Sequence, residues 1–365
     1  MRQMTKITAA ALALVVALGV SGCGRLQISK ELATVNGNMV SVAEYKYYLE
    51  SIKQQMLQEA GAQDEAAFWS GDIDGKKASD VAKERATEEM IRVEIAASKA
   101  QEKGLTLDTA TEGQINTLVK AKDKQTKAQV DSIKESTGLS DQGLKELLIK
   151  TSLASMYAQD VQTNEPDKLE VSDEAITEKY NSDYALVKHI LILSSKEEEA
   201  AASADPAASA DPTASAAPEI SAEEYKAQQK QLADEVLAKA KAGENFEALI
   251  EQYGNDPGMT SQPEGYMIDR EGNSVGSQGG KMVTEFTQGS FSVGVGQITD
   301  LVESSYGWHI IKRYELPTSG ESYDSAVQAI RSSLMQDKYN ELIDSFKSEF
   351  DIQIRQKEID KIKIG

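Results

Sequence analysis

The chain has 365 residues, and its 59 acidic side chains outnumber its 39 lysines and arginines, for a formal net charge of −20. An acidic surface repels phosphate backbones, so this charge argues against a nucleic-acid-binding protein. One cysteine and two histidines exclude a disulfide framework, a thiolate zinc site, an iron–sulfur cluster and a histidine-rich metal site, and we expect neither metal nor cofactor.

The first residues have the pattern of a secretory signal. Arg2 and Lys6 precede an uncharged apolar run, and small residues then lead to Cys23, the only cysteine. The ending Val-Ser-Gly-Cys resembles the bacterial lipobox, in which the cysteine is lipidated and becomes the mature N-terminus. We therefore expect residues 1–22 to be a lipoprotein signal peptide and Cys23 to carry the membrane anchor, rather than an uncleaved membrane span or an inert buried cysteine.

Residues 23–180 have the pattern of a helical lobe. The pair Asn36-Gly37 between two apolar runs predicts a tight hairpin turn. Ser41 and Glu44 predict a capping box at the start of a helix. Apolar residues then recur at helical spacing, which predicts further long helices at about 77–103 and 140–162.

Residues 184–316 have a different composition. Residues 184–193 are apolar and β-branched, as in a buried strand, and residues 308–314 predict a second, closing strand. The low-complexity run 197–220 contains Ser-Ala-Asp-Pro twice and has almost nothing to bury, so we expect a disordered insertion. Residues 255–280 are rich in small and polar side chains and predict an irregular loop.

The C-terminal segment, 317–365, predicts a helix and a short strand. An apolar stripe runs from Val327 to Phe350, and residues 351–354 have strand character. A strand this short is not stable alone, and the stripe needs an apolar partner. We therefore expect both to complete the N-terminal lobe.

The motifs of the middle segment resemble those of parvulin-type peptidyl-prolyl isomerases. In chain order they are VKHILI with His189, FEAL followed by Asn255-Asp256, Phe286, GQI, and YGWHII with His309. The wider layout resembles that of the PrsA-like foldase lipoproteins of Gram-positive bacteria. This resemblance implies an α+β fold, in which a helical N- and C-terminal chaperone lobe carries an inserted parvulin domain, a small antiparallel sheet flanked by helices.

The resemblance also implies a site. His189 and His309 match two strand histidines that face each other and share a hydrogen bond, and Asp256 matches an acidic or thiol position beside the substrate amide. The alternatives are ordinary strand histidines and a loop-capping aspartate before Pro257. Four residues match or lie near the positions of a proline-binding pocket, although such side chains are also common in plain cores: Met282, Phe286, Met267 and Phe291.

The implied function is isomerisation of X-Pro bonds in unfolded or newly exported proline-containing polypeptides, on the extracytoplasmic face of a Gram-positive-type cell membrane. The residues after the first strand include three glutamates and no basic cluster, so we expect no preference for phosphorylated substrates. Ile268 stands where the family has a glycine, which leaves a non-catalytic holdase chaperone as the alternative. A solute-binding lipoprotein is disfavoured because residues 1–180 lack alternating strands and helices.

Overall fold

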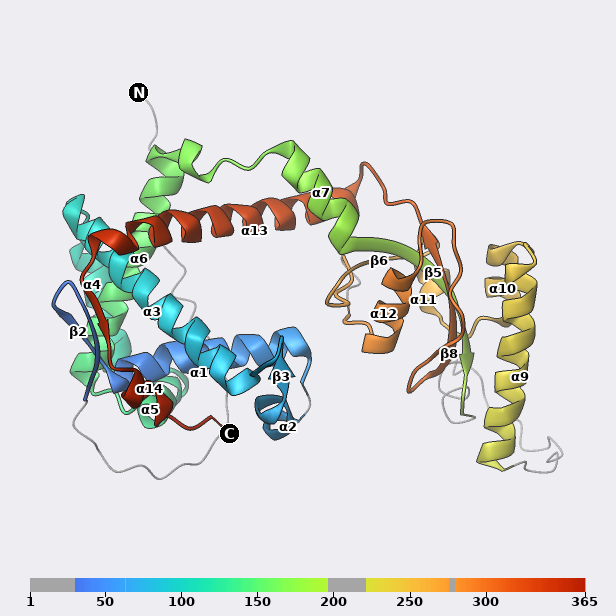
Figure 1. Cartoon of the computed structure of the whole chain (residues 1–365), viewed down its shortest axis with the longest axis horizontal. Coiled ribbons are helices and arrows are strands. Elements are labelled where there is room, and N and C mark those ends of the chain that lie inside the picture. Colours follow the sequence, from blue (N-terminus) through green and yellow to red (C-terminus); the bar gives the residue numbers. More distant parts are fainter. Residues whose placement is uncertain (1–29, 63, 196–220, 276–279, 365) are drawn as a thin grey trace. The chain divides into compact units, whose positions relative to one another are not determined.

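The computed structural model describes residues 30–62, 64–195, 221–275 and 280–364 (Figure 1). Two compact units divide the chain: the first comprises Met1–Glu170 and Met335–Gly365, and the second comprises Val171–Leu334. Cys23 and the low-complexity run lie outside the described residues. Among the helices that are described, none is both long and apolar enough to cross a membrane.

The first unit is built on three long helices that pack on one another: α1 (Val42–Ala60), α3 (Ala78–Glu102) and α6 (Asp141–Asn164) (Figure 1). Ala82 and Ala86 of α3 are fully buried, and side chains this small let the neighbouring helices approach closely. Apart from a terminal hairpin, the other elements up to Glu170 are α2 (Glu65–Ser70), β3 (Asp72–Ile73), β4 (Lys76–Lys77), α4 (Thr109–Val119), α5 (Lys124–Thr137) and the short 3₁₀ helix η1 (Pro166–Leu169).

The hairpin predicted around Asn36 is present, as β1 (Glu31–Val35) and β2 (Asn38–Ser41). Asn36 and Gly37 both have positive φ, 48° and 80°, as a two-residue turn of this kind requires. The far edge of β1 pairs antiparallel with β9 (Ile352–Ile354), from the C-terminal segment. The expected return of that strand to the first lobe is confirmed. The 3₁₀ helix η2 (Phe346–Glu349) and α14 (Gln356–Asp360) flank β9.

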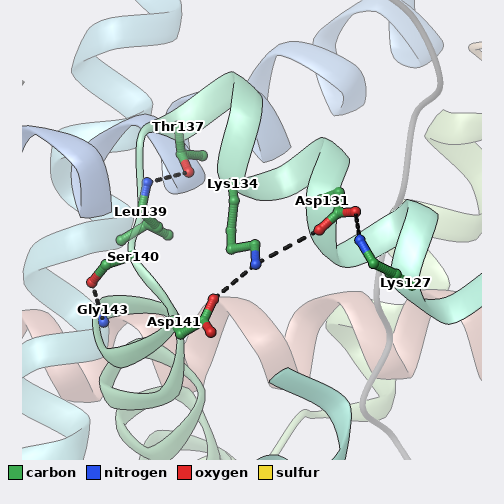
Figure 2. A network of polar contacts seen from close by, with 8 residues as sticks. All are labelled: Lys127, Asp131, Lys134, Thr137, Leu139, Ser140, Asp141 and Gly143. Carbon is green, nitrogen blue, oxygen red and sulfur yellow. Dashed lines mark hydrogen bonds and ion pairs between the residues drawn. The ribbon is translucent and has the colours of Figure 1, made fainter. Parts of the chain in front are cut away.

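The connection between α5 and α6 is fixed by local polar contacts (Figure 2). Gly138 ends α5 with a φ of 82°, and the Ser140 hydroxyl then caps α6 by accepting a hydrogen bond from the Gly143 N–H at 3.0 Å. Lys134 of α5 reaches Asp141 of α6 at 2.8 Å. Exposed ion pairs of this kind add at most about 1 kcal/mol, so the caps rather than the charges define the turn.

Glu44 does not complete the predicted capping box. The Ser41 hydroxyl accepts a hydrogen bond from the Glu44 N–H at 3.1 Å, but the Glu44 carboxylate binds Lys150 of α6 at 2.5 Å. Lys150 also binds Glu94 of α3, whose side chain is 2% exposed. One half-buried ammonium therefore joins three helices and faces two carboxylates. Burial raises the pKa of Glu94 above its ordinary value even though Lys150 opposes the shift.

The second unit contains a four-stranded antiparallel sheet in the order β6-β5-β8-β7. Its strands are β5 (Tyr184–Leu193), β6 (Tyr266–Asp269), β7 (Val302–Glu303) and β8 (Gly307–Tyr314). Helices α9 (Ala222–Lys241) and α10 (Phe246–Tyr253) cover one face, and α12 (Thr284–Ser292) covers the other (Figure 1). This arrangement confirms the expected fold class.

Two expectations were wrong. Residues 255–280 are not simply a loop, because they contain the short helix α11 (Gly258–Ser261) and strand β6. The 327–350 stripe does not pack on one lobe. Most of it lies on α13 (Glu321–Ser345), and its end lies on η2 and Phe350. The residues of α13 up to Leu334 belong to the second unit and those from Met335 to the first.

The second unit is also wider than the 184–316 range. Helix α7 (Asp173–Asp183) and the first part of α13 pack together through Tyr180, Ala326 and Ile330, and Tyr184 of β5 joins the same cluster. Apolar contact with the sheet, rather than the change in composition, therefore defines the limits of the unit.

We predict that Lys150→Met lowers the free energy of unfolding by about 3–5 kcal/mol, because it leaves the buried carboxylate of Glu94 and the half-buried one of Glu44 without a cation. Glu94→Gln should leave stability at pH 8 equal to or above that of the wild type, because the raised pKa of Glu94 means that the folded chain holds its ionised form unfavourably. Urea unfolding followed by Trp69 fluorescence in a Trp308→Phe background reports on this unit. A Lys150→Met chain as stable as its parent would contradict the prediction.

Candidate active site

The register of β5 and β8 brings the two histidines together. His189 is opposite Ile311, and His309 is opposite Leu191, so the two histidines are diagonal neighbours on one face of the sheet. Their rings stack with centroids 5.2 Å apart and planes at 24°, and their Nδ1 atoms lie 3.1 Å apart. Both side chains are buried. The shared hydrogen bond expected from the motifs is therefore possible in this geometry.

Asp256 reaches the pair from the loop after α10. The Asn255 N–H donates to the carbonyl of Leu191 at 2.9 Å, which ties this loop to β5. One Asp256 oxygen, Oδ2, lies 2.6 Å from Nε2 of His189, and the other, Oδ1, accepts a hydrogen bond from the Gly258 N–H at 2.9 Å. The sequence left open whether Asp256 belongs to a site or caps a loop, and the side chain makes both kinds of contact.

Two hydroxyl groups that the sequence analysis did not single out extend the network. The Tyr266 hydroxyl, at the start of β6, donates to Oδ2 of Asp256 at 2.7 Å. The Ser304 hydroxyl lies 2.7 Å from Nε2 of His309. A signal for Ser304 was present, since a hydroxyl just before the turn into the second histidine strand is well placed to reach the ring. Tyr266 could not be found without the pairing of β6.

The pKa values fix most of the proton positions. Burial alone raises the pKa of Asp256, but its contacts with His189, Tyr266 and a backbone N–H outweigh burial and lower the pKa to about 2. The carboxylate therefore only accepts, and Nε2 of His189 carries a hydrogen. Burial, and then the neighbouring His189, lower the pKa of His309 to about 3, so that ring is neutral near pH 7.

Two proton arrangements satisfy these contacts. When His189 is neutral, His309 donates from Nδ1 to His189, and the Ser304 hydroxyl donates to Nε2 of His309. When His189 is protonated, it donates to His309, whose Nε2–H then donates to Ser304. In both arrangements the imidazoles pass hydrogen bonds between Asp256 and Ser304 without exposing a free proton acceptor on either ring.

An apolar wall lies against the histidine pair. The Phe286 ring of α12 is buried and meets both imidazoles edge-on, with centroids 4.9 Å from His189 and 5.4 Å from His309. Met282, half-buried just before α12, packs in the same cluster. Ile268 is fully buried on this face as well, so the position where the family has a glycine contributes another apolar side chain.

The other two proposed pocket residues, Met267 and Phe291, have different surroundings. Met267 was wrongly placed, because β6 alternates and its side chain lies on the opposite face of the sheet, in the cluster of Tyr180 and Tyr184. Phe291 packs at the edge of the Phe286 cluster, and its ring contacts the guanidinium groups of Arg270 and Arg313 instead of the histidines. The structure therefore places Phe286 against the histidines, leaves Met282 and Phe291 beside it in the same apolar cluster, and separates Met267 from them.

Comparison with known proteins places this site in a recognised domain. Residues 174–315 match the model of the PPIC-type PPIASE domain, and residues 1–134 match that of the SurA-like N-terminal domain. Foldase protein PrsA of Caldanaerobacter subterraneus subsp. tengcongensis is 24% identical over 341 residues, which cover 92% of this chain and 90% of the relative. Foldase protein PrsA of Geobacillus kaustophilus is 41% identical over 81 residues, which cover 22% of this chain and 26% of the relative.

A crystal structure of peptidylprolyl isomerase (PrsA) from Bacillus cereus aligns with 92% of this chain and 94% of its own, at 18% identity and a TM-score of 0.30. The domain matches and the relative that aligns over most of its length together confirm that the chain resembles the PrsA-like parvulin foldases.

We predict that acid destabilises the second unit through His309. Because the pKa of His309 falls from an ordinary value of 6.5 to about 3, the unfolded chain binds a proton between these pH values that the folded chain does not. The free energy of unfolding should fall, by at most about 1.4 kcal/mol per pH unit, as the pH drops from 6.5 toward 4. His309→Asn should have a flatter dependence. Urea unfolding followed by Trp308 in a Trp69→Phe background measures both, and equal slopes would contradict the assignment.

Proposed function

We propose that this chain is a membrane-anchored extracytoplasmic foldase that catalyses cis–trans isomerisation of X-Pro bonds in exported polypeptides. The observation that carries the proposal is the arrangement of the only two histidines of the chain. They stack in a hydrogen-bonded network with Asp256, against an aromatic wall, within the segment that matches the PPIC-type domain.

Isomerisation of an X-Pro bond needs a site of suitable shape and polarity and no covalent bond between the protein and the substrate. Resonance keeps the X-Pro amide planar behind a barrier of about 18–20 kcal/mol, and rotation passes through a twisted, less conjugated amide. A catalyst lowers this barrier by holding the pyrrolidine ring while the preceding carbonyl turns, and by presenting fixed dipoles that favour the twisted form. Such a site uses apolar walls together with a small polar network.

The residues of the second unit provide both parts. His189, His309 and Phe286 form a rigid apolar and aromatic floor, since each ring is held by the other two. Met282, Asp256 and Ser304 are the half-buried members, where a bound peptide meets the network. The ionised Asp256 orients the imidazoles and takes no proton from the substrate, because its pKa is about 2.

The first unit would hold unfolded clients while the second acts on their prolines. Its similarity to the SurA-like N-terminal domain supports this role. Residues 1–22 are the signal peptide and 184–316 the core of the isomerase domain in this proposal. The chaperone lobe takes the 23–180 and 317–365 ranges without α7 and the first part of α13, which belong to the second unit. Clients are proline-containing polypeptides without a preferred charge before the proline.

We predict that the chain without its first 23 residues, which precede every described element, accelerates isomerisation of Ala-Pro and Glu-Pro peptides alike in a protease-coupled assay. His189→Asn and Phe286→Leu should each lower kcat/KM about tenfold or more, a loss of at least about 1.4 kcal/mol of transition-state stabilisation. Phe291→Leu is the matched control, because its ring contacts arginines instead of the histidines.

Thermal unfolding of each variant separates a site effect from lost folding. If the wild-type chain does not accelerate isomerisation over the spontaneous rate, the proposed isomerase activity is wrong and the non-catalytic holdase chaperone remains as the function. If the wild type is active and both variants have the same kcat/KM as the wild type, the isomerase activity stands and the assignment of this site is wrong.

We predict that the mature protein begins at Cys23 and partitions with membranes, because the only cysteine ends a lipobox-like sequence. Cys23→Ser should remain unlipidated. Intact-mass analysis of membrane-derived protein measures this directly. A free thiol with residues 1–22 retained would contradict the anchor.

A further inference from the structure

The Tyr266 hydroxyl and the His189 imidazole reach the same carboxylate oxygen from different elements. Tyr266 begins β6, opposite Val187 of β5, and is 8% exposed. Its hydroxyl lies 2.7 Å from Oδ2 of Asp256, and Nε2 of His189 lies 2.6 Å from the same oxygen. The Tyr266 and His189 ring centroids are 5.8 Å apart. The phenol is therefore part of the network. Its loss would leave His189 as the only one of these two side chains that contacts Oδ2 of Asp256.

Gly258 leaves the space that this contact needs. A Cβ at position 258 would lie 1.6 Å from the Tyr266 hydroxyl oxygen, 2.8 Å from the carbon that bears it and 3.1 Å from Oδ1 of Asp256. The backbone of Gly258 does not have a positive φ, so space rather than conformation requires a glycine here. Its N–H also donates to Oδ1 at 2.9 Å. The glycine both makes room for the phenol and holds the second carboxylate oxygen.

Three donors thus surround a carboxylate whose side chain is 20% exposed. A charge with so little water around it is stable only when protein groups replace the lost hydrogen bonds. Burial and the bond to Asp256 raise the pKa of Tyr266 well above its ordinary value, so the phenol remains a neutral donor. The donors from Tyr266 and Gly258 fix the orientation of the carboxylate independently of His189.

We propose that Tyr266 is a positioning residue of this site. With the space that Gly258 leaves, it holds Asp256 ionised and oriented, and so keeps the hydrogen of His189 on Nε2 and the imidazole pair in register beside the substrate. The catalytic part of this inference rests on the proposed isomerase function. The part that concerns the orientation of the histidine rings is independent of that function and can be tested even in a chain without isomerase activity.

Two substitutions break the same contact in different ways. Tyr266→Phe removes only the hydroxyl, and Gly258→Ala keeps the hydroxyl but fills its space. The control is Tyr253→Phe, because the Tyr253 hydroxyl bonds to Lys239, outside the network. The chain from residue 24 is prepared without a histidine tag, so that the ring ¹H–¹⁵N spectrum contains signals from His189 and His309 alone.

Tyr266→Phe and Gly258→Ala should both shift the Nε2–H signal of His189, and both should raise the pKa of Asp256, followed through its ¹³C carboxyl signal, because the ionised form loses a donor. Both should lower kcat about tenfold or more, the size expected for a hydrogen bond to a charged group, with KM unchanged. Tyr253→Phe should match the wild type in all three measurements.

Folded variants with unchanged histidine signals would overturn the inference, whatever their activity. Shifted signals with kcat within twofold of an active wild type would overturn the catalytic part. A wild type without isomerase activity would overturn the proposed function, while the ring spectra would still decide whether Tyr266 positions the histidines.

Discussion

The site in the second unit is organised around one negative charge that has little contact with water, the carboxylate of Asp256. Asp256 is ionised and almost surrounded by protein, so every group near it must donate or make room. That requirement selects a glycine at position 258 and decides which nitrogen of His189 carries a hydrogen. The imidazole pair extends this network to Ser304, which follows the edge strand β7.

The first unit applies the same principle to packing. Lys150 gathers carboxylates from two other helices, and the three partners lie far apart in the sequence. Such a cluster adds little net stability compared with apolar side chains of the same size, but it penalises any packing that separates the partners. In both units, therefore, buried charge specifies one arrangement, while apolar contact supplies most of the free energy.

The sequence was informative where a pattern repeats along one element. The apolar run of β5 and the Asn36-Gly37 turn predicted the structure, because each depends on neighbouring residues. The facing histidines were expected from the resemblance to parvulins instead, since they depend on the pairing of β5 with β8. The sequence was not informative where the contacts of a side chain depend on how distant strands or helices pair. The faces of Met267 and Ile268 follow from the register of β6, and Glu44 exchanged a cap for Lys150 only because α6 packs on α1. Tyr266 was missed for the same reason.

The pairing of β9 with β1 also sets an order in time. Synthesis runs from the N-terminus, so every residue of the second unit exists before Ile352 is added. Until then one edge of β1 has no partner strand, and an open edge is a template for pairing with other chains. A ribosome that stops shortly after Leu334 would therefore release a complete second unit attached to a first unit that is prone to aggregate.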